Sequence, residues 1–111
     1  MRRVYKILTA GEWALARANG RFEGSAVDLT DGYIHLSDAA QVQETARLHF
    51  RGRADLVLVT LDAEALGQAL KWERSRAGAL FPHLYAALDP ALAREARPLA
   101  LGADGVPVIV L

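Results

Sequence analysis

Side chains able to exchange protons alternate with aliphatic ones in DGYIHLSDAAQ, residues 31–41. Tyr33, His35 and Ser37 occupy odd positions of this run. Because successive side chains of a β-strand point to opposite faces, these three residues are expected to share one face. Histidine titrates near neutral pH and is the most frequent general acid or base. This face is therefore a candidate catalytic or binding surface, although an ordinary exposed strand histidine explains the pattern equally well.

A second stretch, FPHLYAAL at residues 81–88, repeats the alternation. His83 and Tyr85 fall on one predicted strand face, and Leu84 falls on the other. Pro82 restricts the backbone at the entry to this strand, so the direction of the His83 side chain is set by a rigid segment.

A carboxylate is supplied by KWERS, residues 71–75, in which Glu73 follows Trp72. An adjacent indole can exclude water from a carboxylate, which raises its pKa toward the range useful for proton transfer. We predict that these groups converge on one cleft, with Lys6 at its edge. The predicted catalytic residues are His35, Glu73 and His83, and the predicted ligand-binding residues are Lys6, Tyr33, Ser37 and Tyr85. The histidines lack the paired local spacing of metal ligands, so no metal site is predicted.

Strand patterns account for most of the segments that must position these residues. Residues 3–8 are rich in β-branched and aromatic side chains, and the continuous apolar run at residues 54–62 indicates a strand buried on both faces. Residues 71–75 and 81–88 are predicted as strands that turn at 77–78. The segments 94–101 and 106–111 are predicted as a hairpin around Asp104–Gly105, with its prolines confined to an edge or to its ends.

Capping patterns predict two main helices. Thr9 and Glu12 have capping-box spacing, which predicts a helix over Ala10–Asn19, and Asp38 and Gln41 repeat that spacing before a predicted helix over Ala39–Arg51. A short helix is predicted over Ala63–Leu70. The segment Arg21–Gly32 is predicted as a loop, because it contains glycines and a turn pair.

Composition indicates one globular α+β domain spanning residues 1–111. The 111-residue chain has no cysteine, which excludes disulfides and thiolate chemistry. Thirteen basic and thirteen acidic residues are scattered, so no broad nucleic-acid footprint is predicted. The sequence has neither a membrane-length apolar run nor a signal-peptide pattern, and a soluble cytoplasmic protein is expected.

Several motifs resemble, in order, the bacterial family catalogued as Domain of Unknown Function 952. They are VYKIL, the tryptophan at 13, DGYIHLS, the glutamine at 41, TA at 45–46, DLVLV, KWERS and FPHLYAAL. The resemblance covers essentially the whole chain. It implies the ADP-ribosyltransferase-like fold, with two packed, split and mostly antiparallel sheets around an NAD cleft.

The resemblance also implies roles for individual residues. Lys6 falls where a transferase carries a histidine or arginine for the ribose or phosphates, and the segment with His35 and Ser37 resembles the one that lies against the nicotinamide. His83 occupies the place of the catalytic glutamate, which is a departure from the transferase pattern. A cleft lined by Lys6, His35 and His83 instead indicates a phosphate-bearing ligand, as in RNA 2′-phosphotransferases of the same fold.

Three functions stay open at this point. In the first interpretation, the domain is an enzyme or degenerate enzyme acting on NAD, ADP-ribose or another phosphate-bearing nucleotide. If it is catalytic, it is a transferase related to ADP-ribosyl or RNA 2′-phosphate transfer. Alternatively, it is a non-catalytic module for a small ligand or peptide. The third interpretation makes the polar strand face a partner or oligomer surface.

Overall fold

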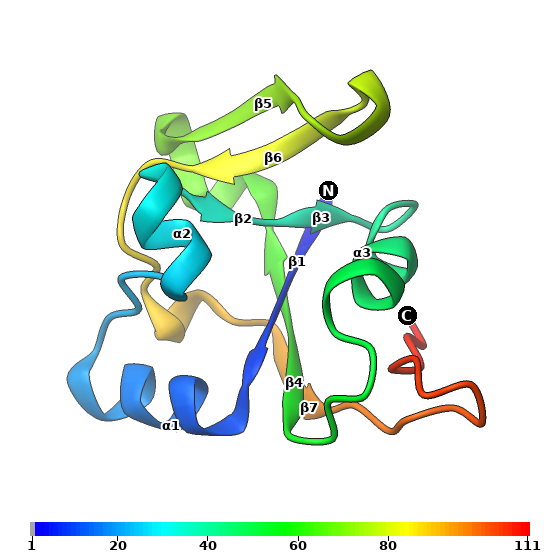
Figure 1. Ribbon diagram of the computed structural model, residues 1–111. Coiled ribbons are helices and arrows are strands. Elements are labelled where there is room, and N and C mark those ends of the chain that lie inside the picture. The colour runs from blue at the N-terminus through cyan, green and yellow to red at the C-terminus, as the bar shows by residue number, and fades with distance from the viewer. Residues whose placement is uncertain (1) are drawn as a thin grey trace.

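The computed structural model describes residues 2–111 as an α+β fold with two antiparallel sheets (Figure 1). One sheet has four strands in the order β3-β1-β4-β7, and the other has three in the order β2-β6-β5. Every pairing between these strands is antiparallel, which confirms the predicted α+β class with two antiparallel sheets. The strands are β1 (Arg3–Thr9), β2 (Ile34–His35), β3 (Ser37–Asp38), β4 (Leu56–Asp62), β5 (Leu70–Arg74), β6 (Leu80–Leu84) and β7 (Glu95–Pro98).

The first main helix has the predicted bounds. Helix α1 spans Ala10–Asn19, and both halves of the predicted capping box form between Thr9 and Glu12. Gly20 ends the helix in the left-handed conformation, with φ of 76°. The other helical segments are α2 (Ala26–Asp31), α3 (Val42–His49) and the short 3-10 segments η1 (Ala63–Ala69), η2 (Arg76–Gly78) and η3 (Pro90–Leu92).

The second main helix, α3, is shorter than predicted. The two side-chain to backbone hydrogen bonds of a capping box do form between Asp38 and Gln41, but they close a turn that precedes the helix and not its first turn. Asp38 also accepts the backbone N–H of Ala40, so residues 39–41 are held outside the helix. The helix therefore begins at Val42 and ends before Phe50.

Three other predicted segments differ from the structure. Helix α2 lies inside the predicted loop Arg21–Gly32. The predicted helix at 63–70 is a 3-10 segment interrupted at Gly67, where φ is 66°. The predicted C-terminal hairpin is much too long: within the described residues it is reduced to one bridge between Leu101 and Pro107, flanked by backbone hydrogen bonds from Gly102 to Val106 and from Val108 to Ala100.

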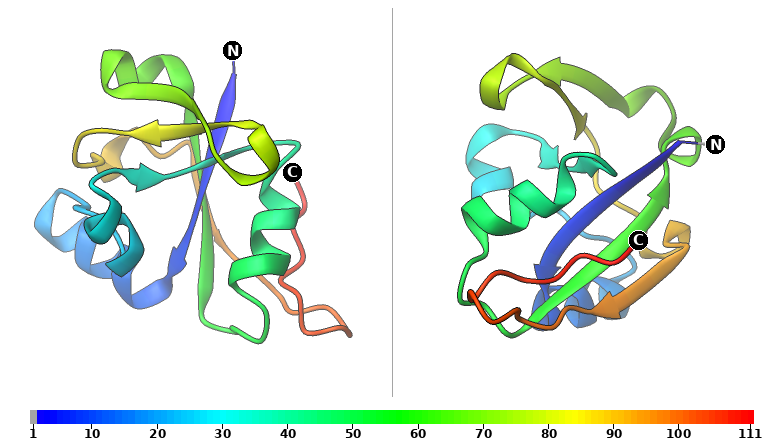
Figure 2. Two further views of the ribbon diagram at one scale, coloured as in Figure 1. Left: turned by 45° about the horizontal axis from the view of Figure 1, so that its top comes forward. Right: turned by 90° about the vertical axis from the view of Figure 1, so that its right-hand side faces the viewer.

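Two apolar cores lie on opposite faces of the four-stranded sheet. The alternation along β4 sends Val57, Val59 and Leu61 into the core shared with α1 and the three-stranded sheet. Leu56 and Leu58 face the other core, which α3 and part of the C-terminal segment cover (Figure 2). All seven residues of β4 are buried, as its continuous apolar run predicted. The four-stranded sheet is thus the central layer of the molecule.

The segment 34–38 passes from one sheet to the other. Ile34 and His35 pair with β6, whereas Ser37 and Asp38 pair with β1. Between them, Leu36 is buried and its N–H donates to the carbonyl of Pro82 at 3.0 Å. The predicted single strand is therefore two short strands that belong to different sheets (Figure 1).

Within residues 2–111, none of the helices combines the length and the apolar character that crossing a membrane requires.

Candidate functional site

Four aromatic rings meet on the outer face of the three-stranded sheet. Antiparallel pairing of β2 with β6 places His35 directly opposite His83, and their ring centroids are 5.7 Å apart. Tyr33 stacks on His83 at 4.1 Å and lies 4.6 Å from His35 and 5.2 Å from Tyr85. We call Tyr33, His35, His83 and Tyr85, with the neighbouring carboxylates of Asp28, Asp31 and Glu73, the ring cluster.

Glu73 joins two of the rings through a single oxygen. His83 Nδ1 lies 2.8 Å from Glu73 Oε1, and the Tyr85 hydroxyl donates to the same oxygen at 2.7 Å. Because an ionised carboxylate only accepts hydrogen bonds, His83 carries its proton on Nδ1. Nε2 of His83 has no hydrogen-bond partner among residues 2–111 and is then a proton acceptor. A histidine oriented by a carboxylate in this way is suited to general base chemistry.

The shifted pKa values of Glu73, Tyr33 and Tyr85 reflect a negatively charged region. The hydrogen bonds from Tyr85 and His83 lower the pKa of Glu73, so its carboxylate is ionised at neutral pH. In return, its bond with Glu73 raises the pKa of Tyr85 to about 12. Burial raises the pKa of Tyr33, and the charges of Asp31, Glu73 and Asp28 raise it further.

Asp28 organises the other half of the ring cluster, although it is not among the predicted site residues. Its side chain is 1% exposed. Four donors satisfy its carboxylate: Lys6 Nζ, the backbone N–H groups of Ser25 and His35, and His35 Nδ1 at 2.6 Å. Burial alone would raise the pKa of Asp28, but the charge of Lys6 and these hydrogen bonds outweigh burial and lower it. The Ser25–Asp28 spacing is a helix-start signal that could have placed Asp28 on a helix.

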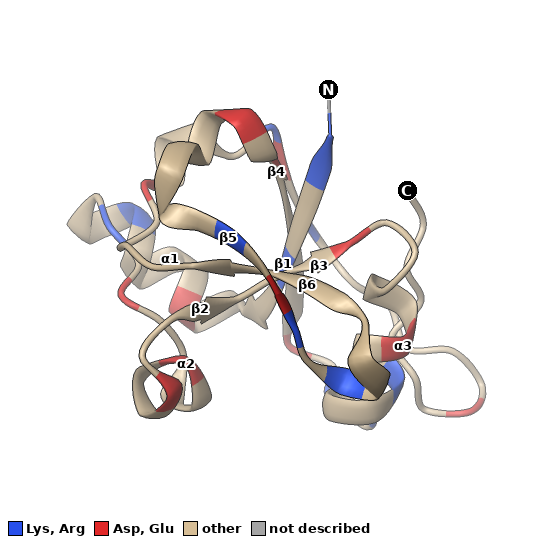
Figure 3. Ribbon diagram, turned by 90° about the horizontal axis from the view of Figure 1, so that it is seen from above, with Lys and Arg blue, Asp and Glu red and all other residues tan. Residues whose placement is uncertain are grey.

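His35 lies between two carboxylates of α2. Nδ1 contacts Asp28, and Nε2 lies 2.9 Å from Asp31 Oδ2. A neutral imidazole has only one N–H, so both contacts are hydrogen bonds only if the ring or Asp31 carries an additional proton. Figure 3 shows the acidic positions of α2 beside the three-stranded sheet, where β5 also carries an acidic residue.

Lys6 is not at the edge of an open cleft, as the sequence analysis predicted. The residue is 5% exposed, and its ammonium group binds Asp28 at 2.9 Å and the His35 carbonyl at 3.0 Å. A lysine on a strand that is buried on both faces needs a carboxylate partner, and α2 supplies it. Lys6 therefore supports the ring cluster from beneath and offers no free cation to a phosphate.

Ser37 also lies away from the rings. It is 4% exposed, pairs with Tyr5 of β1, and its hydroxyl lies 2.9 Å from the hydroxyl of Thr45. Strand parity predicted a shared face with His35, but the chain changes sheets at Leu36, so the parity does not extend that far.

The predicted effect of Trp72 on Glu73 is also wrong. Trp72 packs against the core on the opposite face of β5, beneath the guanidinium of Arg2 at 3.7 Å from the ring centroid. The pKa of Glu73 is lowered and not raised, because its hydrogen-bond donors dominate. Glu73 is thus a stable negative charge and not a proton donor near neutral pH.

The structure brings five of the seven predicted site residues together: Tyr33, His35, Glu73, His83 and Tyr85. Two surface hollows lie elsewhere and contain none of these five. No three histidine, aspartate or glutamate side chains of residues 2–111 are grouped as metal ligands. The ring cluster combines stacked rings, fixed negative charges and one oriented but buried histidine, with Tyr85 exposed at its edge.

Comparisons with known proteins give a family and close structural relatives. The family described as "Protein of unknown function (DUF952)" matches residues 7–95. The crystal structure of protein CC0527 from Caulobacter crescentus has a TM-score of 0.94 and 57% identity, over 96% of this chain and 93% of that chain. Its solution NMR structure has a TM-score of 0.86 and 58% identity, over 95% and 90%. A comparison with curated proteins found no match.

Proposed function

The chain belongs to the DUF952 family, whose description assigns no activity, and we propose from its ring cluster that it binds the cationic nicotinamide end of NAD⁺. The observation that carries this proposal is the gathering of Asp28, Asp31 and Glu73 around stacked aromatic rings. Fixed negative charge beside π-faces favours a flat cation over an anion.

The charges of the ring cluster support a cationic ligand and not a phosphate. Of the nearby lysines, Lys6 is held by Asp28, and the exposed Lys71 donates to the Gln68 carbonyl. With neither His35 nor Asp31 carrying an additional proton, the three carboxylates exceed these two lysines by one charge. The predicted phosphate contacts at Lys6, His35 and His83 are accordingly replaced in this proposal by contacts to a cationic ring.

Tyr33 supplies the surface on which such a ring would lie. One neighbour of Tyr33 is His83, which is stacked against it, and Tyr85 lies on another side. Oxidised nicotinamide is planar and positively charged, and an aromatic face attracts a cation with about 0.5–2 kcal/mol. Two packed antiparallel sheets are also what the resemblance to ADP-ribosyltransferases implies, and this favours NAD⁺ among flat cations.

The test compares ligands that differ in ring charge but share the same phosphates. Isothermal titration calorimetry with NAD⁺ and NADH measures the effect of replacing the aromatic cation by a neutral dihydro ring, and ADP-ribose measures the remainder of the molecule without the ring. We expect NAD⁺ to bind more tightly than NADH by roughly two- to thirtyfold, and ADP-ribose to bind at least as weakly as NADH. 1-Methylnicotinamide, which has no phosphate, should compete with NAD⁺.

Matched variants locate the effect. Glu73→Gln keeps the shape of the side chain and removes its charge, so it should reduce the preference for NAD⁺ over NADH. Glu23→Gln removes an exposed carboxylate that pairs with Arg21 and should leave the preference unchanged. Equal affinity for NAD⁺ and ADP-ribose, or an unchanged preference in Glu73→Gln, would show that the ring cluster does not bind nicotinamide.

A further inference from the structure

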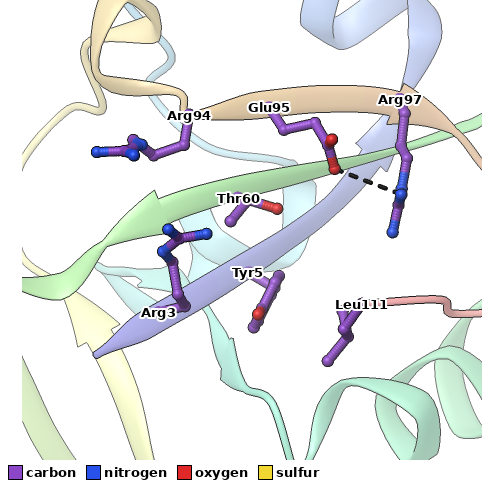
Figure 4. Close-up of a pocket in the computed structure, with 7 residues that line it drawn as sticks. All are labelled: Arg3, Tyr5, Thr60, Arg94, Glu95, Arg97 and Leu111. Atoms are coloured by element: carbon purple, nitrogen blue, oxygen red, sulfur yellow. Dashed lines mark ion pairs between the residues drawn. The ribbon is translucent and has the colours of Figure 1, made fainter. Parts of the chain in front are cut away.

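We propose that a second site, on the opposite side of the four-stranded sheet from the three-stranded sheet, binds the phosphate group of a small phosphorylated molecule. The site is a hollow of about 200 Å³ in which Arg3, Arg94 and Arg97 surround two hydroxyl groups (Figure 4). It is independent of the ring cluster and of the nicotinamide proposal.

Strand register gathers the lining residues on one face. Tyr5 of β1 pairs with Thr60 of β4, and Thr60 pairs with Glu95 of β7. Leu58 pairs with Arg97 in the same way, so Arg97, two residues after Glu95 on β7, projects on this face. Farther along, this face is covered by α3 and apolar residues, which leaves the hollow at the end that the helix does not reach.

The floor of the hollow carries two hydroxyl groups without partners. Tyr5 is 7% exposed and Thr60 is 6% exposed. Neither hydroxyl makes a hydrogen bond within residues 2–111, although both residues line the hollow. Neither hydroxyl oxygen is among the buried unpartnered atoms of residues 2–111, so both open into the hollow and are available to hydrogen-bond a ligand there.

The walls of the hollow are cationic. Arg3 and Arg94 share the carboxylate of Asp62 at 2.9 Å and 3.0 Å. Arg3 approaches Asp62 Oδ1, an atom that accepts no hydrogen bond within residues 2–111. The contact from Arg3 is therefore an ion pair without hydrogen-bond alignment. Arg97 lies 3.5 Å from Glu95, a loose and partly exposed pair. Three guanidinium groups thus face two carboxylates, and most of their N–H donors are free for a ligand.

These donors match the chemistry of phosphate. A guanidinium group offers parallel N–H donors that suit two oxygens of a phosphate, and neutral hydroxyls can bind the remaining oxygens. Figure 4 shows Arg3 and Arg94 on one side of Thr60 and Tyr5, and Arg97 on the other. The volume is below that of a typical pocket for a drug-sized ligand, which favours a phosphate on a small molecule.

The experiment titrates the protein with inorganic phosphate at neutral pH, and follows binding by calorimetry and by backbone amide NMR shifts. We expect saturable binding with shifts concentrated at residues 3–5, 60 and 94–97. Arg97→Gln should weaken binding by about tenfold to a hundredfold, since it removes a charge-assisted contact. Tyr5→Phe keeps the packed ring and removes one hydroxyl, so it should weaken binding by a smaller factor.

Arg21→Gln is the matched control for Arg97→Gln. Both arginines pair with a glutamate two residues away, but Arg21 lies outside the hollow. We expect Arg21→Gln to bind phosphate like the wild type, and thermal unfolding to show that each variant is folded. Absence of saturable phosphate binding, equal weakening by both arginine variants, or shifts confined to other residues would overturn the site. Equal affinity for acetate would overturn the assignment to phosphate.

Discussion

At the scale of single residues, Glu73 controls the protons of two rings. One carboxylate oxygen accepts from both His83 and Tyr85, so the charge of Glu73 holds the proton on Tyr85 and sets the tautomer of His83. Each of these residues would be ordinary on an isolated strand. Their chemistry results from the shared oxygen.

The pKa of Tyr85 tests this interaction directly. The phenol donates to Glu73, and both the lost hydrogen bond and charge repulsion oppose its ionisation, so its pKa is raised from 10.0 to about 12. We expect Glu73→Gln to return this pKa toward 10.0, as measured by phenolate absorbance. Because the folded value is the higher one, the contact stabilises the fold below pH 10, and this stabilisation is lost as the pH rises to about 12.

Tyr85→Phe provides the control for that titration, because it removes the Tyr85 transition and leaves those of the other tyrosines. If Glu73→Gln leaves every tyrosine midpoint where it is in the wild type, the bond between Tyr85 and Glu73 does not form in solution.

Strand parity explains which site residues the sequence predicts. His83 lies on β6 and Tyr85 directly follows that strand, so alternation alone places both side chains on the same face. Ser37 was grouped wrongly, because alternation gives no sign that the chain changes sheets at Leu36. Asp28 was not predicted as a site residue because its role depends on Lys6, which is distant in sequence and contacts it only in the folded chain.

At the scale of elements, α2 is anchored by its one buried carboxylate. The helix is only six residues long, and within it only Asp28 is buried. An isolated helix of that length is unstable in water, so its position depends on tertiary contacts. Asp28 provides them through Lys6 of β1 and His35 of β2, and it thereby links the helix to both sheets.

Asp28→Asn should destabilise the protein strongly. The change leaves the Lys6 ammonium buried without its counter-ion, and breaking a buried ion pair on one side costs about 3–5 kcal/mol of unfolding free energy. Urea denaturation at neutral pH measures this loss. Since the folded pKa of Asp28 is below 3.8, its contribution is present above pH 3.8 and is lost as the pH falls below that value.

Asp31→Asn is the matched control, because Asp31 ends the same helix and contacts the other nitrogen of His35. Its side chain is 41% exposed, so its removal should cost no more than about 1 kcal/mol. Similar stability losses for the two variants would mean that Asp28 does not anchor α2.

Local signals predicted some elements well and others poorly. Helix α1 has a complete capping box and a terminal glycine, and both ends were predicted correctly. The C-terminal hairpin was predicted from Asp104–Gly105, and Gly105 does adopt the left-handed conformation of a turn, with φ of 79°. The pairing around the turn is limited to one bridge with two backbone hydrogen bonds, because beyond it the C-terminal segment packs against α3 and Gln43.

At the scale of the whole molecule, the four-stranded sheet joins two cores into one folding unit. Strand β4 contributes alternate side chains to each core, so neither core can open without disturbing the same strand. The radius of gyration of 13.0 Å agrees with that of one compact domain of this length. We therefore propose that residues 1–111 unfold as one domain.

Leu58→Ala and Leu61→Ala test this coupling. The two leucines lie on the same strand, are 1% and 0% exposed, and face opposite cores. Each truncation should cost about 2–5 kcal/mol, and both variants should retain a single transition. Circular dichroism and tryptophan fluorescence should therefore give coincident melting curves. A second transition in either variant would show that the cores are independent.

The pairing of His35 with His83 has a consequence for the order of folding. Glu73, His83 and Tyr85 come from the β5–β6 hairpin and its end, while Asp28, Asp31 and His35 come from one continuous segment. Each half of the ring cluster is therefore local in sequence, and the β2–β6 pairing and the stacking of Tyr33 on His83 join them. Contacts between residues distant in sequence form later than local ones, because the entropy of closing the intervening loop must be met before those contacts stabilise the chain. We expect the β5–β6 half to form first, and the Asp28–His35 half, whose short helix depends on tertiary contacts, to be completed late together with the contact between the histidines.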